Sequence, residues 1–529
     1  MAGMQQAMAE GRVTSHELVQ QSLTRIALYE DQLNAVITVN RRAIEDADAR
    51  DRERAAGRVR GPLHGIPIAL KDNIHTTDMP TTGGALAFAE LVPPYEATVT
   101  RNLREAGAVI IAKTQMTELA NWVTVGMPAN YNSLTGYGFN PYDPRRDPRA
   151  ATADGRPVLA PGGSSSGIGT SASFWAANVG TETSGSILNP ANQTMLVGIK
   201  PTVGRVSRYG IIPITADQDT AAPMARSMAD AATLLDAMEG ATRDANDPAT
   251  LGGSATPGPP YTCPPPPGGD YTRVLDAAAL TGARIGVPRA FFYERVTAEQ
   301  RAAMEEAIAV LRQRGAIVVD PADIPSVVDA DPEKNFLSWN ICAGLENGRG
   351  TDRGCSVAFK YGMKRDFNAW LASLGPAAPV KTLAELRRWN IDHQRAGTLK
   401  YGQQNLDVSD EMDVERDRQR YEADRTKDVL LSAVHGIDEV MGTHTLDALL
   451  FPGATGAAIA ARPGYPSVIV PFAVVPNAPM PPFPAGFSAR PAPFGVSFTG
   501  TACSEPRLIA LAYAFEQATK RRIAPPLFP

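Results

Sequence analysis

The sequence predicts a layered α/β protein. Segments with strand-like and helix-like patterns alternate along most of the chain, and residues 283–320 read as strand, helix and strand. Hydrophobic residues make up 43% of the 529 residues and charged residues 20%, which is ordinary for a globular protein with a sizeable core.

The first elements are indicated by caps, apolar runs and glycine stops. "TSHELVQQSLTRI", starting at Thr14, opens with a capping box and continues at helical spacing, so it predicts a helix. The apolar run 66–70 predicts a strand that ends on Lys71. Residues 98–116 predict a helix, a stop at Gly107 and a strand over 109–112.

The middle of the chain continues the alternation. Residues 195–214 predict two short strands, and a helix is expected to begin at Ser227. The segment "LGGSATPGPPYTCPPPPGGD" (251–270) predicts a surface linker, because its prolines cannot sustain a helix or a central strand. Residues 283–320 predict a parallel βαβ unit.

The C-terminal half is predicted to be helical first and then strand-rich. Residues 330–440 read mainly as helix. Three apolar segments, "ALLFP", "PSVIVPF" and "FGVSFTG", predict strands, and residues 505–522 predict a final helix.

Composition excludes several functional classes. The net charge of −5 and the lack of a long Lys/Arg run argue against a nucleic-acid partner, and no run of 18 apolar residues predicts a membrane span. The start of the sequence lacks the pattern of a signal peptide, which predicts a soluble, cytoplasmic protein, although an exported form with its leader removed would look the same. The four cysteines show no metal-binding spacing and leave the disulfide state open: Cys263, Cys342, Cys355 and Cys503.

The stretch "GGSSSGIGTSASFWAANVGTETSGSI" (162–187) is the main candidate for chemistry. Its apolar residues argue against a flexible linker, and a phosphate-binding loop is excluded because Ile168 follows Gly167 where a lysine would be required. Residues 163–167 fit the G-x-S-x-G pattern, so one alternative is a Ser-His-Asp α/β hydrolase that uses Ser165. That alternative requires one of three downstream histidines: His393, His435 or His444.

A second hypothesis needs a base other than histidine. Lys71 ends an apolar strand, so its side chain is expected to lie in a medium of low dielectric. Burial disfavours the charged form and can lower a lysine pKa from about 10.4 by as much as about 3–5 units. A neutral lysine could then activate a serine.

Four ordered blocks carry a family resemblance. "GPLHGIPIALKDNI", "PGGSSSG", "GTETSGSILNPA" and "VGIKPTVGRVSRYGIIP" resemble the core motifs of the amidase signature family, and "PFGVSFTGTACSEPRLIALAYAFEQAT" resembles its C-terminal block. The resemblance covers most of residues 10–245 and 440–525, and the segment from Lys200 looks most similar to bacterial peptide amidases.

The resemblance implies one large α/β domain over residues 1–529, with a mixed central sheet covered by helices on both faces. Its expected parts are N-terminal helices (1–60), a catalytic core (61–250), a Pro-rich surface linker (251–272), a βαβ and helical substrate-side region (273–440), and C-terminal core strands with a helix (441–529).

The resemblance also assigns roles to residues. Lys71 matches the base, Ser164 the bridging serine on a cis peptide bond, and Ser186 the nucleophile. Backbone N–H groups around Thr183, Ser184 and Gly185 match the oxyanion hole, and neither a cofactor nor a metal is implied. The chain departs from the family in reading Ser-Gly-Ser for the usual Gly-Gly-Ser, and in a serine-to-serine segment about two residues shorter.

The expected activity is hydrolysis of neutral amides, because residues 187–193 supply no arginine for an acidic substrate. The candidate substrates are peptide C-terminal amides, aryl or alkyl amides, carbamates and esters. The protein is expected to act as a monomer or homodimer, with neither a nucleic acid nor a membrane as partner. Two further alternatives are the amidase subunit of a tRNA-dependent amidotransferase and a non-catalytic binding protein on this scaffold. The proline-rich segment 474–495 is expected to form either the rim of an apolar pocket or an inert surface loop. Its aromatic residues are Phe483, Phe487 and Phe494.

Overall fold

The centre of the protein is one sheet of eleven strands, seen in a computed structural model that describes residues 1–253, 261–344, 348, 352 and 354–528. Parallel pairs, such as β2 with β3 and with β6, lie beside antiparallel pairs, such as β14 with β15, so the sheet is mixed. In spatial order the strands are β1 (Val36–Val39), β3 (Val109–Thr114), β2 (Pro67–Lys71), β6 (Ala177–Glu182), β8 (Thr220–Ala225), β7 (Val197–Lys200), β14 (Ser467–Val475), β15 (Ala492–Thr499), β13 (Ala448–Pro452), β9 (Arg284–Gly286) and β10 (Ile317–Val319).

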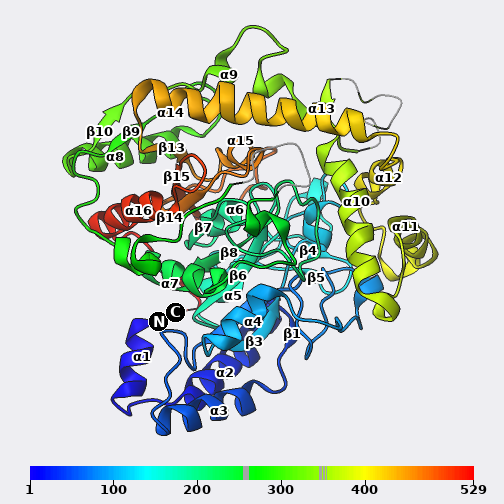
Figure 1. Cartoon of the computed structure of the whole chain (residues 1–529), viewed down its shortest axis with the longest axis vertical. Coiled ribbons are helices and arrows are strands. Elements are labelled where there is room, and N and C mark those ends of the chain that lie inside the picture. The colour runs from blue at the N-terminus through cyan, green and yellow to red at the C-terminus, as the bar shows by residue number, and fades with distance from the viewer. Residues whose placement is uncertain (254–260, 345–347, 349–351, 353, 529) are drawn as a thin grey trace.

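Helices cover both faces of this sheet, as the alternation of side chains along a strand requires (Figure 1). In β2, Ile68 and Leu70 join the core formed with α4 and α7, whereas Ala69 joins the core formed with α2 and α3. The described residues thus form one α/β domain with a mixed sheet between helical layers, as predicted. Its helices are α1 (Ala2–Ala9), α2 (Ser15–Leu33), α3 (Ala43–Ala55), α4 (Thr98–Glu105), α5 (Ile168–Ser171), α6 (Leu188–Gln193), α7 (Met228–Glu239), α8 (Ala298–Gln313), α9 (Pro325–Val328), α10 (Ala358–Ser373), α11 (Leu383–Asp392), α12 (Gln404–Asp410), α13 (Arg418–Val429), α14 (Asp438–His444), α15 (Ala457–Ala461) and α16 (Glu505–Thr519).

Most predicted elements are confirmed. Helix α2 begins with the expected capping box between Thr14 and Glu17, and β2 ends on Lys71. The βαβ unit is present, because β9 and β10 pair in parallel around α8. The three predicted tail strands are β13, β14 and β15, followed by α16.

One prediction is corrected, and the predicted linker is found to be tied to the core. Only the first of the two strands expected in 195–214 forms, as β7. The second contributes an isolated bridge between Ile211 and Ile74, and Pro213 has no backbone N–H with which to extend a ladder. The described part of the predicted linker is anchored, since Cys263 forms a disulfide with Cys503 and Tyr271 is fully buried. Residues 254–260 of that segment lie outside the described residues.

The helical region 358–444 forms a wall beside and above the sheet (Figure 1). Helices α13 and α14 continue one another through a π-helical segment, Leu430–Ile437. Next to this wall, β11 (Asn340–Ile341) pairs with β12 (Cys355–Ser356), and a second disulfide joins Cys342 to Cys355. Within the described ranges, no helix has the length and apolar character needed to cross a membrane.

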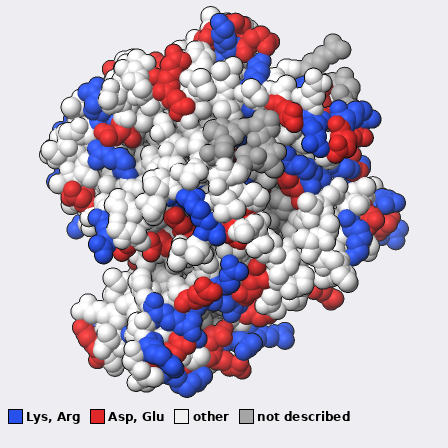
Figure 2. All heavy atoms as spheres, viewed as in Figure 1, with Lys and Arg blue, Asp and Glu red and all other residues white. Residues whose placement is uncertain are grey.

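Charges of both signs are interspersed on the face shown in Figure 2. Ion pairs join neighbouring segments of the described chain, such as Arg104 with Asp78 and Arg60 with Glu53. The described side chains on that face therefore form no broad positive stripe of the kind that follows a phosphate backbone.

The packing of α5 against Trp175 provides a test of the fold. A Cβ atom at Gly169 would lie 2.2 Å from Cζ2 of the buried Trp175 ring, so Gly169→Ala is expected to lower the free energy of unfolding by about 1–3 kcal/mol. Gly442→Ala is the matched control, because a Cβ atom at this helical position meets nothing within 4 Å. Denaturant unfolding of both variants checks the prediction, and equal stability of the two would contradict it.

Candidate active site

Lys71 is buried at the end of β2, between the neighbouring strands β3 and β6. Its side chain is fully buried, and its Nζ donates hydrogen bonds to Ser164 Oγ at 2.9 Å and to Thr181 Oγ1 at 2.8 Å. Two hydroxyl groups are therefore the short-range partners of this amine, rather than a carboxylate.

Burial is the main influence on this lysine. It lowers the pKa of Lys71 to about 7, although the carboxylates of Asp219 and Glu182 oppose the shift by favouring the charged amine. Near neutral pH a large fraction of Lys71 is thus uncharged and able to accept a proton.

Ser164 lies in a loop that turns through two glycines in the left-handed region, Gly162 with φ 82° and Gly163 with φ 39°. The expected cis peptide bond before Ser164 is wrong: the two cis bonds of the described chain precede Pro321 and Pro481. The glycine turn, held through the Gly163 carbonyl by Thr117 Oγ1 at 3.0 Å, directs the chain here instead.

Ser186 lies in the turn between β6 and α6. This turn packs against residues 162–166, the loop that carries Ser164 and is called the serine loop below. A Cβ atom at Gly163 would lie 3.1 Å from Ser186 Cα, and Ser165 N donates to Ser186 O at 3.3 Å. The structure brings the Lys71–Ser164 pair and the Ser186 turn together, but among the described contacts no hydrogen bond joins the Ser164 and Ser186 hydroxyls.

The turn before Ser186 presents free backbone donors. In the described chain, the N–H groups of Thr183, Ser184, Gly185 and Ser186 form no backbone hydrogen bond. Gly185 has a φ of 87°, which favours glycine at this position. The next two N–H groups, of Ile187 and Leu188, are bound by Glu182 at 2.6 and 3.0 Å, so this buried carboxylate fixes the start of α6.

Asp219 is a site residue that the sequence analysis missed. It is buried, it accepts a hydrogen bond from the Thr183 hydroxyl, and it accepts the backbone N–H groups of Ile214 and Thr215 at 2.9 and 3.0 Å. Burial raises the pKa of Asp219 to about 7. It follows Gln218, whose Nε2 donates to Thr183 O at 3.1 Å, so the two residues support the turn before Ser186.

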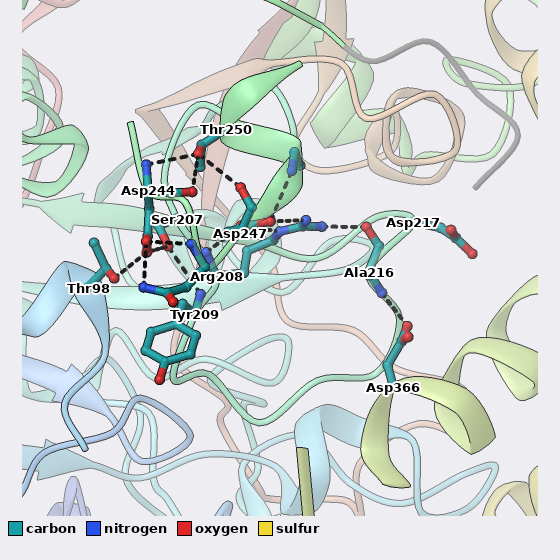
Figure 3. A network of polar contacts seen from close by, with 12 residues as sticks. Thr98, Ser207, Arg208, Tyr209, Ala216, Asp217, Asp244, Asp247, Thr250 and Asp366 are labelled. Carbon is teal, nitrogen blue, oxygen red and sulfur yellow. Dashed lines mark hydrogen bonds and ion pairs between the residues drawn. The ribbon is translucent and has the colours of Figure 1, made fainter. Parts of the chain in front are cut away.

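A polar network holds the segment that leads to Asp219 (Figure 3). Arg208 forms a bidentate ion pair with Asp247, with distances of 2.6 and 2.8 Å, and also donates to Ala216 O. Ala216 N in turn donates to Asp366 of α10 at 2.6 Å. The network fixes the loop from two sides, which limits how far Asp219 can move relative to Thr183.

A pocket of about 570 Å³ opens beside Ser184, and its lining includes aromatic rings as well as the polar side chains of Arg295 and Arg462. Its wall includes the rings of Phe291, Phe336, Trp339 and Phe359. The indole N–H of Trp339 donates to Asp428 of α13 at 2.9 Å, which fixes this ring.

The aromatic rings of the proline-rich segment 474–495 lie outside the pocket beside Ser184. Phe483 and Phe487 pack in a separate cluster with Tyr142, Val158 and Leu159, and Phe494 is buried in β15. None of the three belongs to the wall of the pocket beside Ser184.

The alternative nucleophile and its histidines are not brought together. Ser165 Oγ donates to Thr181 O at 2.8 Å and accepts from Thr181 N at 3.1 Å, so it is used in holding the backbone. His435 contacts Asp329 and Glu439, and His393 stacks on Trp389. The remaining candidate, His444, ends α14.

One group in the described chain has the spacing of metal ligands: Cys342, Asp352 and Cys355. The two cysteines are joined as a disulfide, so they offer no thiolate.

This fold and site define an α/β enzyme with a buried lysine beside two serine-bearing turns. The chain belongs to the amidase signature family and is an amide-hydrolysing enzyme: the family model "Amidase" matches residues 17–509. It is 33% identical to a protein named a probable amidase of Arabidopsis thaliana, covering 99% of this chain and 90% of that protein.

A solved structure and a component of an amidotransferase are also similar to this chain. The structure of the native peptide amidase of Stenotrophomonas maltophilia is 35% identical, with a TM-score of 0.81 over 99% of this chain and 97% of that one. A glutamyl-tRNA(Gln) amidotransferase subunit of a Synechococcus strain is 30% identical over 98% of this chain and 96% of that protein.

The lowered pKa of Lys71 predicts a pH-dependent stability. Below pH 7 both folded and unfolded chains carry the proton, and the cost of burying the charge is present in full. Between pH 7 and the ordinary value of 10.5 only the unfolded chain binds it, so this cost declines as the pH rises. Lys71→Met is therefore expected to gain stability over wild type at pH 6 and to lose that gain towards pH 10. Denaturant unfolding of both proteins at each pH measures the difference; a difference that stays constant or grows with pH would contradict the assignment.

Proposed function

We propose that this enzyme hydrolyses neutral amides through an acyl-enzyme on Ser186, with Ser164 as the bridging serine and Lys71 as the base. The observation that carries the proposal is the hydrogen bond of 2.9 Å between the buried Lys71 Nζ and Ser164 Oγ. A lysine whose pKa lies near 7 can take part in general base catalysis at neutral pH.

The proposed reaction moves one proton along two serines. Neutral Lys71 takes the proton of Ser164 as Ser164 takes the proton of Ser186, and Ser186 Oγ attacks the amide carbonyl. The proton returns along the same groups to the leaving nitrogen as the C–N bond breaks. Water then cleaves the acyl ester and restores Ser186. The Ser186 hydroxyl approaches Ser164 on substrate binding in this proposal, since catalytic hydrogen bonds are often long before the substrate is bound.

The oxyanion that forms in this step would be bound by the turn before Ser186. The free N–H groups of Thr183, Ser184 and Gly185 support this role. One such donor contributes about 2.7–4 kcal/mol to a transition state. Asp219 and Gln218 would hold the turn in shape through Thr183.

The pocket beside Ser184 favours substrates with an apolar or aromatic group next to the amide. Peptide amides and aryl or alkyl amides fit this description, and the named activity of the Stenotrophomonas relative is that of a peptide amidase. Carbamates and esters are further substrates that the same acyl-enzyme chemistry would accept. We propose that the enzyme acts as a monomer or homodimer.

The two disulfides bear on the compartment. Disulfides persist in oxidising environments and are rare in the cytosol. They favour an exported enzyme over a cytoplasmic one.

A second candidate is the amidase subunit of a tRNA-dependent amidotransferase, favoured by the 30% identity to the amidotransferase component from Synechococcus. Co-purification of the chain with tRNA and a second protein of such a complex would support it, whereas hydrolysis of simple amides by the isolated chain supports the free-standing enzyme.

Labelling with a fluorophosphonate tests the mechanism. We expect the label on Ser186, identified by peptide mass mapping, and a labelling rate that rises with pH through about 7, because the base must be neutral. Lys71→Ala is expected to slow labelling by about 10²–10⁴-fold, the usual contribution of a general base. Label on Ser165 that is insensitive to Lys71→Ala would contradict the proposal, and complete lack of labelling would favour a binding role.

Trp339 provides a test of substrate preference. Trp339→Ala is expected to lower kcat/KM for 3-phenylpropionamide by about 10-fold or more relative to butyramide, because it removes one wall of the pocket. The matched control is Trp389→Ala, since Trp389 of α11 stacks on His393 and lies outside the pocket wall. An unchanged ratio of the two substrates in Trp339→Ala would show that the aromatic group binds elsewhere.

A further inference from the structure

Asn130 lies fully buried in the loop that faces the serine loop, and its backbone is left-handed, with a φ of 58°. Asparagine is one of the few residues besides glycine that adopt this conformation readily. The loop is closed on either side of it: Asn130 N donates to Thr117 Oγ1 at 2.7 Å, and Asn130 O accepts from Gly138 N at 2.9 Å.

The side-chain amide of Asn130 reaches three backbone carbonyls of the serine loop. Nδ2 lies 2.9 Å from Gly162 O, 3.1 Å from Gly163 O and 3.3 Å from Ser165 O. All three are acceptors, so they require the nitrogen of the amide, and not its oxygen, to face the loop.

Thr117 supplies the remaining contacts. Its Oγ1 donates to Gly163 O at 3.0 Å and its N donates to Ser164 O at 3.1 Å. Together, Asn130 and Thr117 hold the carbonyl groups of four consecutive residues, 162–165. The orientation of these peptide groups fixes where the Ser164 side chain leaves the backbone.

We propose that Asn130 is a positioning residue that holds Ser164 in line between Lys71 and Ser186; this inference rests on the proposed function. The Lys71–Ser164 hydrogen bond of 2.9 Å requires Ser164 Oγ at a defined position, and Ser164 is joined directly to two of the peptide groups that Asn130 and Thr117 hold. Displacement of a reacting group by about 1 Å can slow a reaction by about 10²-fold.

Asn130→Gly is the test variant, because glycine accepts the left-handed backbone and removes only the amide. Asn34→Gly is the matched control: Asn34 is also left-handed, with a φ of 45°, and its Nδ2 donates to Thr135 O and Tyr137 O at 2.9 and 2.8 Å. Both variants lose an amide that holds backbone carbonyls, but only Asn130 contacts the serine loop.

The measurement is saturation labelling of Ser186 with a fluorophosphonate, which separates the labelled fraction, the first-order rate constant and the half-saturating concentration. We expect Asn130→Gly to reach full labelling with a first-order rate constant about 10²-fold below wild type and an unchanged half-saturating concentration. Asn34→Gly is expected to keep the wild-type rate constant. Asn130→Asp, which turns a carboxylate towards three carbonyls, is expected to be at least as slow.

Three outcomes would overturn the inference. A wild-type rate constant with a reduced labelled fraction in Asn130→Gly would mean that Asn130 only stabilises the fold. A change confined to the half-saturating concentration would place its effect on binding. Failure of wild-type Ser186 to react at all would refute the proposed function, and the role of Asn130 would fall with it.

Discussion

The burial of one amine at the end of β2 is the constraint on which the rest of the site depends. An unpaired ammonium ion in a dry interior is strongly disfavoured, so Lys71 must either lose its proton or find compensating charge. Its nearest partners are the hydroxyls of Ser164 and Thr181, and the carboxylates of Asp219 and Glu182 act on it without hydrogen-bonding to it. This balance brings its pKa to about 7, where the neutral and charged forms exchange readily.

Segments far apart in the chain are required to maintain that balance. The sheet places β2 beside β6, which brings Lys71 to Thr181 and to the turn before Ser186. The loops around residues 117–138 and 205–219 then approach from outside the sheet. One holds the serine loop by its carbonyls, and the other carries Asp219, itself fixed through the Arg208 network (Figure 3). Hydrogen bonds from neighbouring loops therefore hold the two serine-bearing turns, while the pocket wall comes mainly from residues 291–295, 336–341 and 455–462.

Local sequence patterns predicted helix α2 and the strand that ends on Lys71. Hydrophobic periodicity and helix-capping residues are properties of short segments, so they can be recognised without the tertiary structure. Ser164 and Ser186 could be singled out only through the ordered motifs of the family, because a Gly-rich stretch with seven serines does not by itself distinguish one serine from another. Asp219, Asn130 and the aromatic pocket were missed because they come together only through tertiary contacts. The cis bond that the family resemblance implied before Ser164 was wrong, because the cis bonds of the described chain precede Pro321 and Pro481.

The most direct test of this account is the pKa of Lys71 itself. Lysine labelled with ¹³C at Cε can be followed by NMR during a pH titration of the folded protein, and the signal lost in Lys71→Met assigns the residue. The account predicts one lysine signal, absent from the variant, that titrates with a midpoint of about 7. A Lys71 midpoint near the ordinary value of about 10.4 would contradict it, because the amine would then be charged at neutral pH and unable to act as the base.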